Sequence, residues 1–235
     1  MKSLVQHIKE EFKFRISKET AKGRYSYFPE TKEELKRVIQ DHYHNKVYDL
    51  NDIDVSQITD FSQLFLEDEN TSKSKFDISG WDVSNGEDFS WMFYNCINFN
   101  CDLSNWNVSK GINFKKMFSY CEKFNSDLSN WNVSNGKDFK IMFAECKNFN
   151  SDLSKWDVSN GKNFSYMFNN CYIFNSDLSK WDVSNGEDFR GMFCNCKKFN
   201  ADLSNWDVSN GKQFYGMFEG CPIKQEFKSK HTDIE

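Results

Sequence analysis

Residues 151–175, SDLSKWDVSNGKNFSYMFNNCYIFN, repeat the preceding segment, residues 126–150, SDLSNWNVSNGKDFKIMFAECKNFN, at 16 of 25 positions. Tryptophan, glycine and cysteine recur at the same 25-residue interval along most of the chain. A fixed period of this length is typical of a protein that stacks one supersecondary unit many times. We therefore expect the recurring residues to form the interior of the stack. The tryptophan and cysteine ladders are Trp81, Trp106, Trp131, Trp156, Trp181 and Trp206, and Cys96, Cys121, Cys146, Cys171, Cys196 and Cys221.

The first part of each repeat has the alternation of a strand. Trp156 and Val158 alternate with Lys155 and Asp157, which predicts a short strand with one buried side. The segment Ser-Asn-Gly that follows interrupts the pattern. We expect its glycine, here Gly161, to permit a tight turn.

The second part of each repeat has the spacing of a helix. Phe164, Met167, Phe168 and Cys171 stand at positions i, i+3, i+4 and i+7, which predicts one apolar face of a short helix. The sequence therefore predicts an α/β repeat solenoid. It is leucine-rich-repeat-like, with one short parallel β-strand plus one short helix per 25-residue repeat and an N-terminal helical cap.

Three regions follow from these patterns. Residues 1–48 are expected to form an N-terminal helical cap, with one helix at 3–14 and a second that starts at the capping box Thr31–Glu34 and runs to about His44. Residues 49–221 are expected to form the solenoid, with a degenerate cap repeat at 49–75 that includes a loop at 67–75, and six 25-residue repeats from about residue 76. Residues 222–235 form a charged tail, which would leave an open C-terminal sheet edge for self-association or a partner.

The repeat also has a family signature. The units NWNVSNGKDFKIMF (130–143) and KWDVSNGKNFSYMF (155–168), joined by C-x-x-F-N-x-D-L-S, resemble the 25-residue BspA-type leucine-rich repeats of bacterial surface proteins. These are also described as the DUF285 or mycoplasma-lipoprotein repeat. The resemblance covers residues 49 to about 221 and implies surface display, adhesion and protein binding without catalysis. The usual V-S-N-V-T-x-M is here V-S-N-G-K-x-F, and we expect this chain to lack the signal peptide, lipobox or wall anchor that is usual in such proteins.

Composition narrows the range of partners and compartments. The chain has 30 basic and 35 acidic residues with a net charge of -5, so it lacks the basic footprint of a nucleic-acid-binding protein. No stretch is long and apolar enough to span a membrane. The N-terminal segment has no apolar core of a secretory signal, which predicts a cytoplasmic location, whereas the family resemblance implies the cell surface.

Residue types that carry chemistry are already used by the repeat. Histidine occurs only at 7, 42, 44 and 231, and the chain has no phosphate-binding loop motif. The Asp column at 102, 127, 152, 177 and 202 and the Asn column at 100, 125, 150, 175 and 200 have two readings, a calcium ladder or side chains that bond backbone groups in turns, and we favour the second. We expect no catalytic residue, no metal and no cofactor.

The cysteines also have two readings. One thiol per repeat is expected as a packed, reduced column, and disulfides between some of them are the alternative. Cys101 and Cys194 lie outside the ladder and are expected to be the exposed thiols.

Two surfaces are candidates for binding. The first is the solvent face of the expected strands, which would be broad, polar and nearly uniform. Its residues are Asn105, Asn107, Asn130, Asn132, Lys155, Asp157, Lys180, Asp182, Asn205 and Asp207. The second is a more variable patch on the helix side, made of Trp91, Ile141 and Tyr166.

The sequence thus predicts a non-enzymatic protein-interaction or adhesion module whose partner is another protein. The alternative is a structural or host-interaction scaffold that acts inside the cell or is encoded by a virus or mobile element, with no dedicated ligand. The strand face has its own alternative, since its residues serve solubility alone if nothing binds there.

Overall fold

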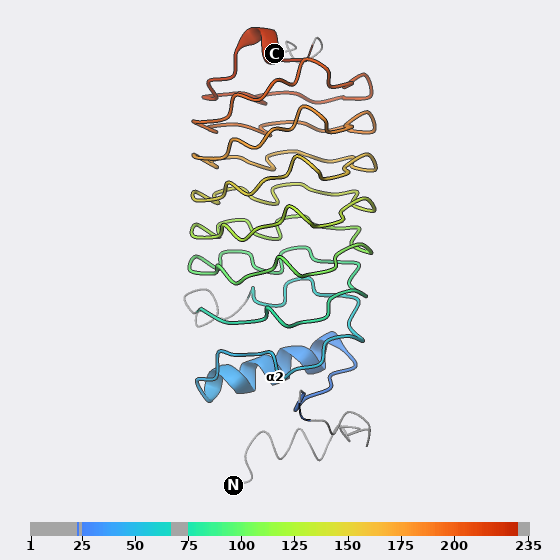
Figure 1. Ribbon diagram of the computed structural model, residues 1–235, viewed down its shortest axis with the longest axis vertical. Coiled ribbons are helices and arrows are strands. Elements are labelled where there is room, and N and C mark those ends of the chain that lie inside the picture. The colour runs from blue at the N-terminus through green and yellow to red at the C-terminus, as the bar shows by residue number, and fades with distance from the viewer. Residues whose placement is uncertain (1–22, 24, 67–74, 230–235) are drawn as a thin grey trace.

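The computed structural model describes residues 23, 25–66 and 75–229, and it shows a tall stack of similar coils (Figure 1). Parallel backbone contacts link each coil to the next at one shared position. These contacts pair Asp60 with Asp88, Asp88 with Asn113, Asn113 with Asp138, Asp138 with Asn163, Asn163 with Asp188 and Asp188 with Gln213. The stacking of 25-residue units is therefore confirmed.

The prediction of a strand and a helix in each repeat is wrong. Within the described residues, the α-helix is α2, Lys32–His44, and a 3-10 helix, η1, spans Gln225–Phe227. Neither lies inside the repeats, and the coils touch through single-residue bridges where a sheet would have continuous strands. Each coil is built from successive turns.

Turns take the place of the expected helix because the backbone N–H groups bond to the next coil. The N–H of Met167 closes a turn on the Phe164 carbonyl at 3.1 Å. The N–H groups of Tyr166 and Phe168 instead donate to the carbonyls of Arg190 and Met192, at 2.7 and 2.9 Å. A helix would send both of these N–H groups back four residues within the same segment. Tyr166 also has a φ of 56°, which no right-handed helix contains.

Two turns, one on each side, shorten the segment that was expected to form a strand. The N–H of Trp156 bonds to the Leu153 carbonyl at 3.1 Å, and the N–H of Gly161 bonds to the Val158 carbonyl at 2.7 Å. Only a short extended stretch remains between these two turns. The predicted burial of Trp156 and Val158 is confirmed, at 3 % and 1 % exposed. The indole Nε1–H of Trp156 bonds to the Leu128 carbonyl of the previous coil at 2.9 Å.

The core is a set of aromatic columns that run along the stack. The indole rings of Trp106, Trp131, Trp156, Trp181 and Trp206 follow one another at 6.4 Å with planes within 4° of parallel. Phe164 stacks in the same way on Phe139 and Phe189, at 5.6 and 5.5 Å. Each phenyl group buries roughly 200 Å², which contributes about 5 kcal/mol at 25 cal/mol per Å². Because the stacking contacts of each ring come from neighbouring coils, a single repeat is not expected to be stable alone.

The recurring glycine is required by packing. A Cβ on Gly161 would lie 2.3 Å from Cζ of Phe164 and 2.9 Å from the Val158 carbonyl oxygen. The φ of Gly161 is not in the left-handed region, so the turn itself does not need glycine. The expected reason for this column, freedom to make a tight turn, is therefore replaced by the close approach of a phenyl ring.

The thiol column is packed and reduced, as expected. Cys146 and Cys171 are fully buried, and their Sγ–H groups donate to the carbonyls of Phe118 and Phe143 at 2.9 and 3.0 Å. All eight cysteines are free. The expectation of two exposed thiols is met only in part, since Cys101 and Cys194 are half-buried. Burial raises the pKa of Cys101 to about 12, so this thiol does not ionise near neutral pH.

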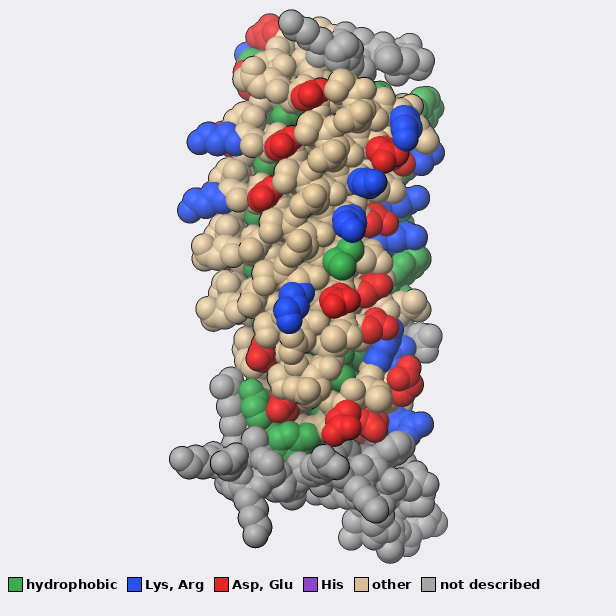
Figure 2. All heavy atoms as spheres, turned by 90° about the vertical axis from the view of Figure 1, so that its right-hand side faces the viewer, with side chains coloured by type: hydrophobic (Ala, Val, Ile, Leu, Met, Phe, Trp, Pro, Cys, Tyr) green, Lys and Arg blue, Asp and Glu red, His purple; other side chains and the backbone are tan. Residues whose placement is uncertain are grey.

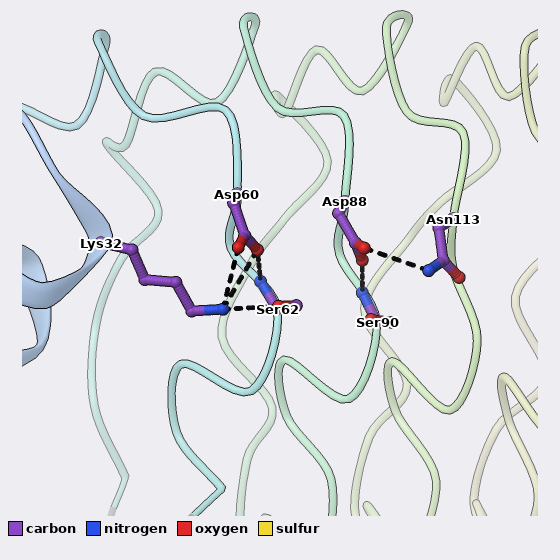
Figure 3. Close-up of polar contacts among 6 residues, drawn as sticks. All are labelled: Lys32, Asp60, Ser62, Asp88, Ser90 and Asn113. Atoms are coloured by element: carbon purple, nitrogen blue, oxygen red, sulfur yellow. Dashed lines mark hydrogen bonds and ion pairs between the residues drawn. The ribbon is translucent and has the colours of Figure 1, made fainter.

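Helix α2 covers the N-terminal end of the stack, and the helix expected from the capping box is confirmed. Thr31 caps it by accepting the Glu34 N–H at its Oγ1, at 3.2 Å. Lys32 reaches the first coil, where its Nζ lies 3.1 Å from both carboxylate oxygens of Asp60 and 2.5 Å from Oγ of Ser62 (Figure 3). The apolar side of the helix is buried, at Leu35, Val38, Ile39 and Tyr43. The helix expected at 3–14 and residues 67–74 of the expected loop lie outside the described residues.

The C-terminal segment folds back over part of the last coil. The Leu203 N–H donates to the Phe227 carbonyl at 2.8 Å, and the Lys224 N–H donates to Oδ1 of Asn200 at 3.3 Å. Ile223 is 7 % exposed. The expected open sheet edge is wrong, because the described residues of the stack form no sheet. The boundaries of the three predicted regions stay a prediction.

Candidate interaction surface

The uniform surface predicted from the strand pattern is exposed, but it lies on turns and half of it serves the backbone. Oδ1 of Asp157 accepts the Ser159 N–H at 3.0 Å, and Oδ1 of Asn132 accepts the Ser134 N–H at 3.1 Å. The same bond occurs at Asn107, Asp182 and Asp207. The exposed turn residues between them show no side-chain bond of this kind, namely Asn105, Asn130, Lys155, Lys180 and Asn205. Figure 2 shows one long side of the stack on which backbone and uncharged polar side chains predominate.

The side chains of the Asp and Asn columns, for which a calcium ladder was the alternative, accept hydrogen bonds from backbone N–H groups. This is the interpretation that we favoured from the sequence. Asp152 Oδ1 accepts the Ser154 N–H at 2.9 Å, and Asn150 Oδ1 accepts the Asn175 N–H of the next coil at 2.8 Å. No cluster of three metal-ligating side chains occurs in the described part of the chain.

These aspartates predict acid sensitivity. Hydrogen bonds from the N–H and hydroxyl of the serine two residues on lower the pKa of Asp102, Asp152 and Asp202 below the ordinary value of 3.8. A carboxyl group whose pKa is lower in the folded state than in the unfolded state stabilises the fold. This stabilisation is fully present at a pH above the unfolded-state pKa, and it is lost as the pH falls through the folded-state pKa. We expect a melting temperature that is flat from pH 8 to about pH 5 and falls below about pH 4.

Asparagine provides the control for this pH dependence. Its side-chain oxygen makes the same bond at Asn107 and Asn132 without titrating. A variant with Asn at 102, 152, 177 and 202 should therefore lose part of the acid transition, as measured by circular-dichroism melts at each pH. A wild-type melting temperature that stays constant down to pH 2 would contradict this explanation.

The repeats differ mainly on the segment of turns equivalent to residues 90–98, which we call the variable turn surface. It comprises the outward side chains of residues 90–98, 115–123, 140–148, 165–173 and 190–198. All three members of the predicted helix-side patch, Trp91, Ile141 and Tyr166, lie on it and are partly exposed. They do not form one patch, because Trp91 and Tyr166 stand three coils apart.

An aromatic cluster surrounds Trp91. The rings of Trp91 and Tyr94 lie 4.8 Å apart between centroids, and those of Tyr94 and Tyr120 lie 5.6 Å apart. Nζ of Lys116 sits 3.7 Å from the Trp91 ring centroid, a cation–π contact between neighbouring coils. We call these four residues the Trp91 cluster. Tyr120 is 43 % exposed, so the cluster presents a free aromatic face to solvent.

The Trp91 cluster is also positively charged. Burial, followed by repulsion from Lys115 and Lys140, lowers the pKa of Lys116. The Lys116 N–H bonds to the Lys140 carbonyl of the next coil at 2.9 Å, so Lys140 adjoins Lys115 and Lys116 on this side of the stack. Such a surface suits a partner that brings carboxylates together with apolar side chains.

Tyr166 and Ile141 have other surroundings. A Cβ built on Gly191 would meet the Tyr166 ring at 2.3 Å, so the tyrosine lies directly over the glycine of the next coil. Trp91, Ile141 and Tyr166 all have positive φ values, of 60°, 59° and 56°. The left-handed conformation costs a non-glycine residue about 1–2 kcal/mol, and for β-branched isoleucine it is a marked outlier.

Relieving this strain should stabilise the protein. Ile141→Gly is expected to raise the free energy of unfolding by about 1 kcal/mol, because glycine occupies the left-handed region without strain. Chemical denaturation measures the change.

The reverse substitution is the control. Gly216→Ala should lower the free energy of unfolding, because Gly216 has a φ of 63° and only the Glu219 carboxylate, at 3.4 Å, lies near its added Cβ. Changes of the same sign in the two variants would contradict strain as the cause.

The fold and this surface define a stacked-turn repeat protein with an aromatic core and one variable side. Comparison with known protein families then shows to which family the chain belongs. Residues 33–146 and 128–232 match the family described as Mycoplasma protein of unknown function, DUF285. The chain belongs to this family, and the resemblance seen in the repeat sequence is confirmed. The chain matches no curated protein and no solved structure.

Proposed function

We propose that this protein is a non-enzymatic protein-interaction or adhesion module, and that its partner docks on the variable turn surface at the Trp91 cluster. The observation that carries the proposal is the grouping of three aromatic rings and a lysine from neighbouring coils on a partly exposed surface. Aromatic residues dominate the energetics of protein interfaces.

The chemistry of the remaining surface supports a binding role over catalysis. Cys101 lies with Asp77 and Asp102 beside a hollow of about 290 Å³. Cys101 Sγ donates to Asp77 at 3.4 Å, and its raised pKa makes it a poor nucleophile. In the part of the chain that the structure describes, no helix has the length and apolar character of a membrane span.

The partner is expected to be acidic at the point of contact. Lys115, Lys116 and Lys140 would face its carboxylates, while Trp91 and Tyr120 would cover its apolar side chains. Because exposed charges are screened by salt, binding should weaken between 50 and 500 mM salt by about tenfold or more.

A comparative capture experiment tests the site. The immobilised protein of residues 1–235 is incubated with cell extracts, and bound proteins are quantified by mass spectrometry for the wild type and for Trp91→Ala/Tyr120→Ala. We expect the proteins that elute with salt from the wild type to be lost in the double variant. Melting curves confirm that the double variant is folded.

Two matched variants serve as controls. Tyr172→Ala removes an exposed tyrosine of the variable turn surface outside the Trp91 cluster. Lys155→Glu/Lys180→Glu reverses charges on the uniform surface. Partners retained by both controls and lost by the cluster variant support the proposal. Partners lost only with the lysine variant would move the site to the uniform surface, and an absence of specific partners would favour the scaffold without a ligand.

A further inference from the structure

The uniform surface consists of two columns of exposed side chains whose charges vary together. The columns stand on either side of the buried tryptophans, as Lys155 and Asp157 stand on either side of Trp156, which is 3 % exposed. Because Trp156 lies in a short extended stretch, its two neighbours point to the same side, about 7 Å apart. The residues of the first and second columns, coil by coil, are Asn105 and Asn107, Asn130 and Asn132, Lys155 and Asp157, Lys180 and Asp182, and Asn205 and Asp207. Lysine thus occurs in the first column only where aspartate occupies the second.

These charges are not used for ion pairs within the described part of the chain. Lys155 and Lys180 are exposed, and neither forms an ion pair there. Oδ1 of Asp157 and of Asp182 accepts the N–H of the serine two residues on, at 3.0 Å in both cases. This bond fixes the position of each carboxylate but does not neutralise its charge. The surface therefore presents fixed negative groups beside positive groups that have no partner in the same coil.

Two-fold symmetry makes this surface complementary to itself in one orientation. If two copies meet with parallel stacks about an axis that runs along the stack between the columns, the first column of each copy faces the second column of the other, coil against the same coil. Lys155 then faces Asp157 of the second copy, and asparagine faces asparagine or aspartate at the uncharged positions. Antiparallel stacks would instead bring each column against itself. Lysine would face lysine and aspartate would face aspartate, and like charges disfavour that contact.

We propose that the uniform surface pairs two copies of this chain side by side, with parallel stacks and with equivalent coils level. Charge complementarity selects a second copy as the occupant, because the two columns of one chain match each other at every coil. Each copy contributes two lysine–aspartate pairs, from Lys155 and Lys180, and the asparagines form amide contacts beside them. Ion pairs at exposed positions are individually weak and are screened by salt, so the pairing is weak and salt-dependent. The inference goes beyond the proposed function, since the Trp91 cluster lies on a different segment of the coil.

Sedimentation velocity of the protein of residues 1–235 is the first test. The wild type should self-associate at up to about 500 µM protein in low salt, and association should weaken at least about tenfold in 500 mM salt. Lys155→Glu/Lys180→Glu should also weaken it at least about tenfold, because glutamate then faces aspartate. Lys123→Glu/Lys198→Glu, the matched control, makes the same change in net charge at exposed lysines outside the uniform surface and should associate as the wild type does. A monomeric wild type, or equal losses in the two variants, would overturn the proposal.

A mixture of two variants tests which columns face each other. Asp157→Asn/Asp182→Asn removes both carboxylates and keeps the turns, because Asn132 makes the same bond to the Ser134 N–H. Mixed with Lys155→Glu/Lys180→Glu, this variant brings its lysines against intact aspartates. The mixed pair, followed through a fluorescent label on one variant, should therefore form at least about fivefold more readily than either variant pairs with itself. Melting curves check that both variants are folded. Association of the mixture that is no stronger than that of the separate variants would overturn the inference.

Discussion

Gly161→Ala is expected to lower the free energy of unfolding by about 3 kcal/mol. The added Cβ would lie 2.3 Å from Cζ of Phe164, and that ring is held between Phe139 and Phe189 by stacking on both faces. The Val158 carbonyl, at 2.9 Å, prevents relief in the other direction. Urea denaturation followed by tryptophan fluorescence measures the loss.

A double substitution separates this clash from other effects of alanine. In a Phe164→Ala background the ring is absent, so Gly161→Ala should cost less than about 1 kcal/mol. The control for backbone freedom is Gly216→Ala, which strains φ without a clash of this kind. If Gly161→Ala costs the same with and without the Phe164 ring, the packing explanation of the glycine column fails.

Phe164→Ala alone should cost about 4 kcal/mol, within the range for truncating a fully buried phenylalanine. Phe164 is 0 % exposed and stacks on rings of both neighbouring coils. Phe214 occupies the same column in the last coil and is 8 % exposed, and within the described residues its ring stacks on Phe189 only. Phe214→Ala should therefore cost about half as much. Equal losses at the two positions would mean that contacts between coils do not set the stability.

Part of the fold could be predicted from the sequence, because the period of the repeat records which residues are buried. The burial of Trp156, Phe164 and Cys171 follows from their recurrence, and α2 follows from the capping box at Thr31. The path of the backbone could not be predicted in the same way. Turns closed by bonds from i+3 to i place the side chains at i, i+3 and i+4 on one side, as a helix does. The spacing of Phe164, Met167 and Phe168 is therefore common to both.

The signal against a helix was present in a different column. Positions equivalent to residue 91 hold Trp91, Lys116, Ile141, Tyr166, Gly191 and Gly216, and all of them have positive φ. Two glycines in the middle of an expected apolar helix indicate a left-handed residue, but their partners in the column hide it. The prediction of a strand was wrong for a related reason. The alternation at Trp156 and Val158 shows which side chains are buried, and it does not show that the backbone pairs with a neighbouring strand.

The candidate site was found only in part. Trp91 was identified because it varies within its column, which also holds Lys116, whereas Tyr94 and Tyr120 belong to two other columns. They meet only when one coil is stacked on the next. Aromatic residues at variable, outward positions were the available signal. The uniform surface was predicted correctly as exposed, yet the side chains of Asn107 and Asp157 are largely committed to their own turns.

The aromatic core and the variable turn surface of this chain can be compared with those of other members of its family. The chain belongs to the DUF285 family, so the pairing of an invariant aromatic core with one variable turn surface offers a way to compare its members. Substitutions in the Trp, Phe, Gly and Cys columns are expected to change stability. Under the proposed function, substitutions on the variable turn surface are expected to change the partner.

The backbone hydrogen bonds of one inner coil test the central claim most directly. Scalar couplings across hydrogen bonds, measured by NMR on deuterated protein, identify the carbonyl that each N–H contacts. The structure predicts a coupling from the Phe168 N–H to the carbonyl carbon of Met192, 24 residues ahead in the next coil. A coupling from the Phe168 N–H to the carbonyl of Phe164 would instead show a helix in each repeat and would contradict the stacked-turn architecture.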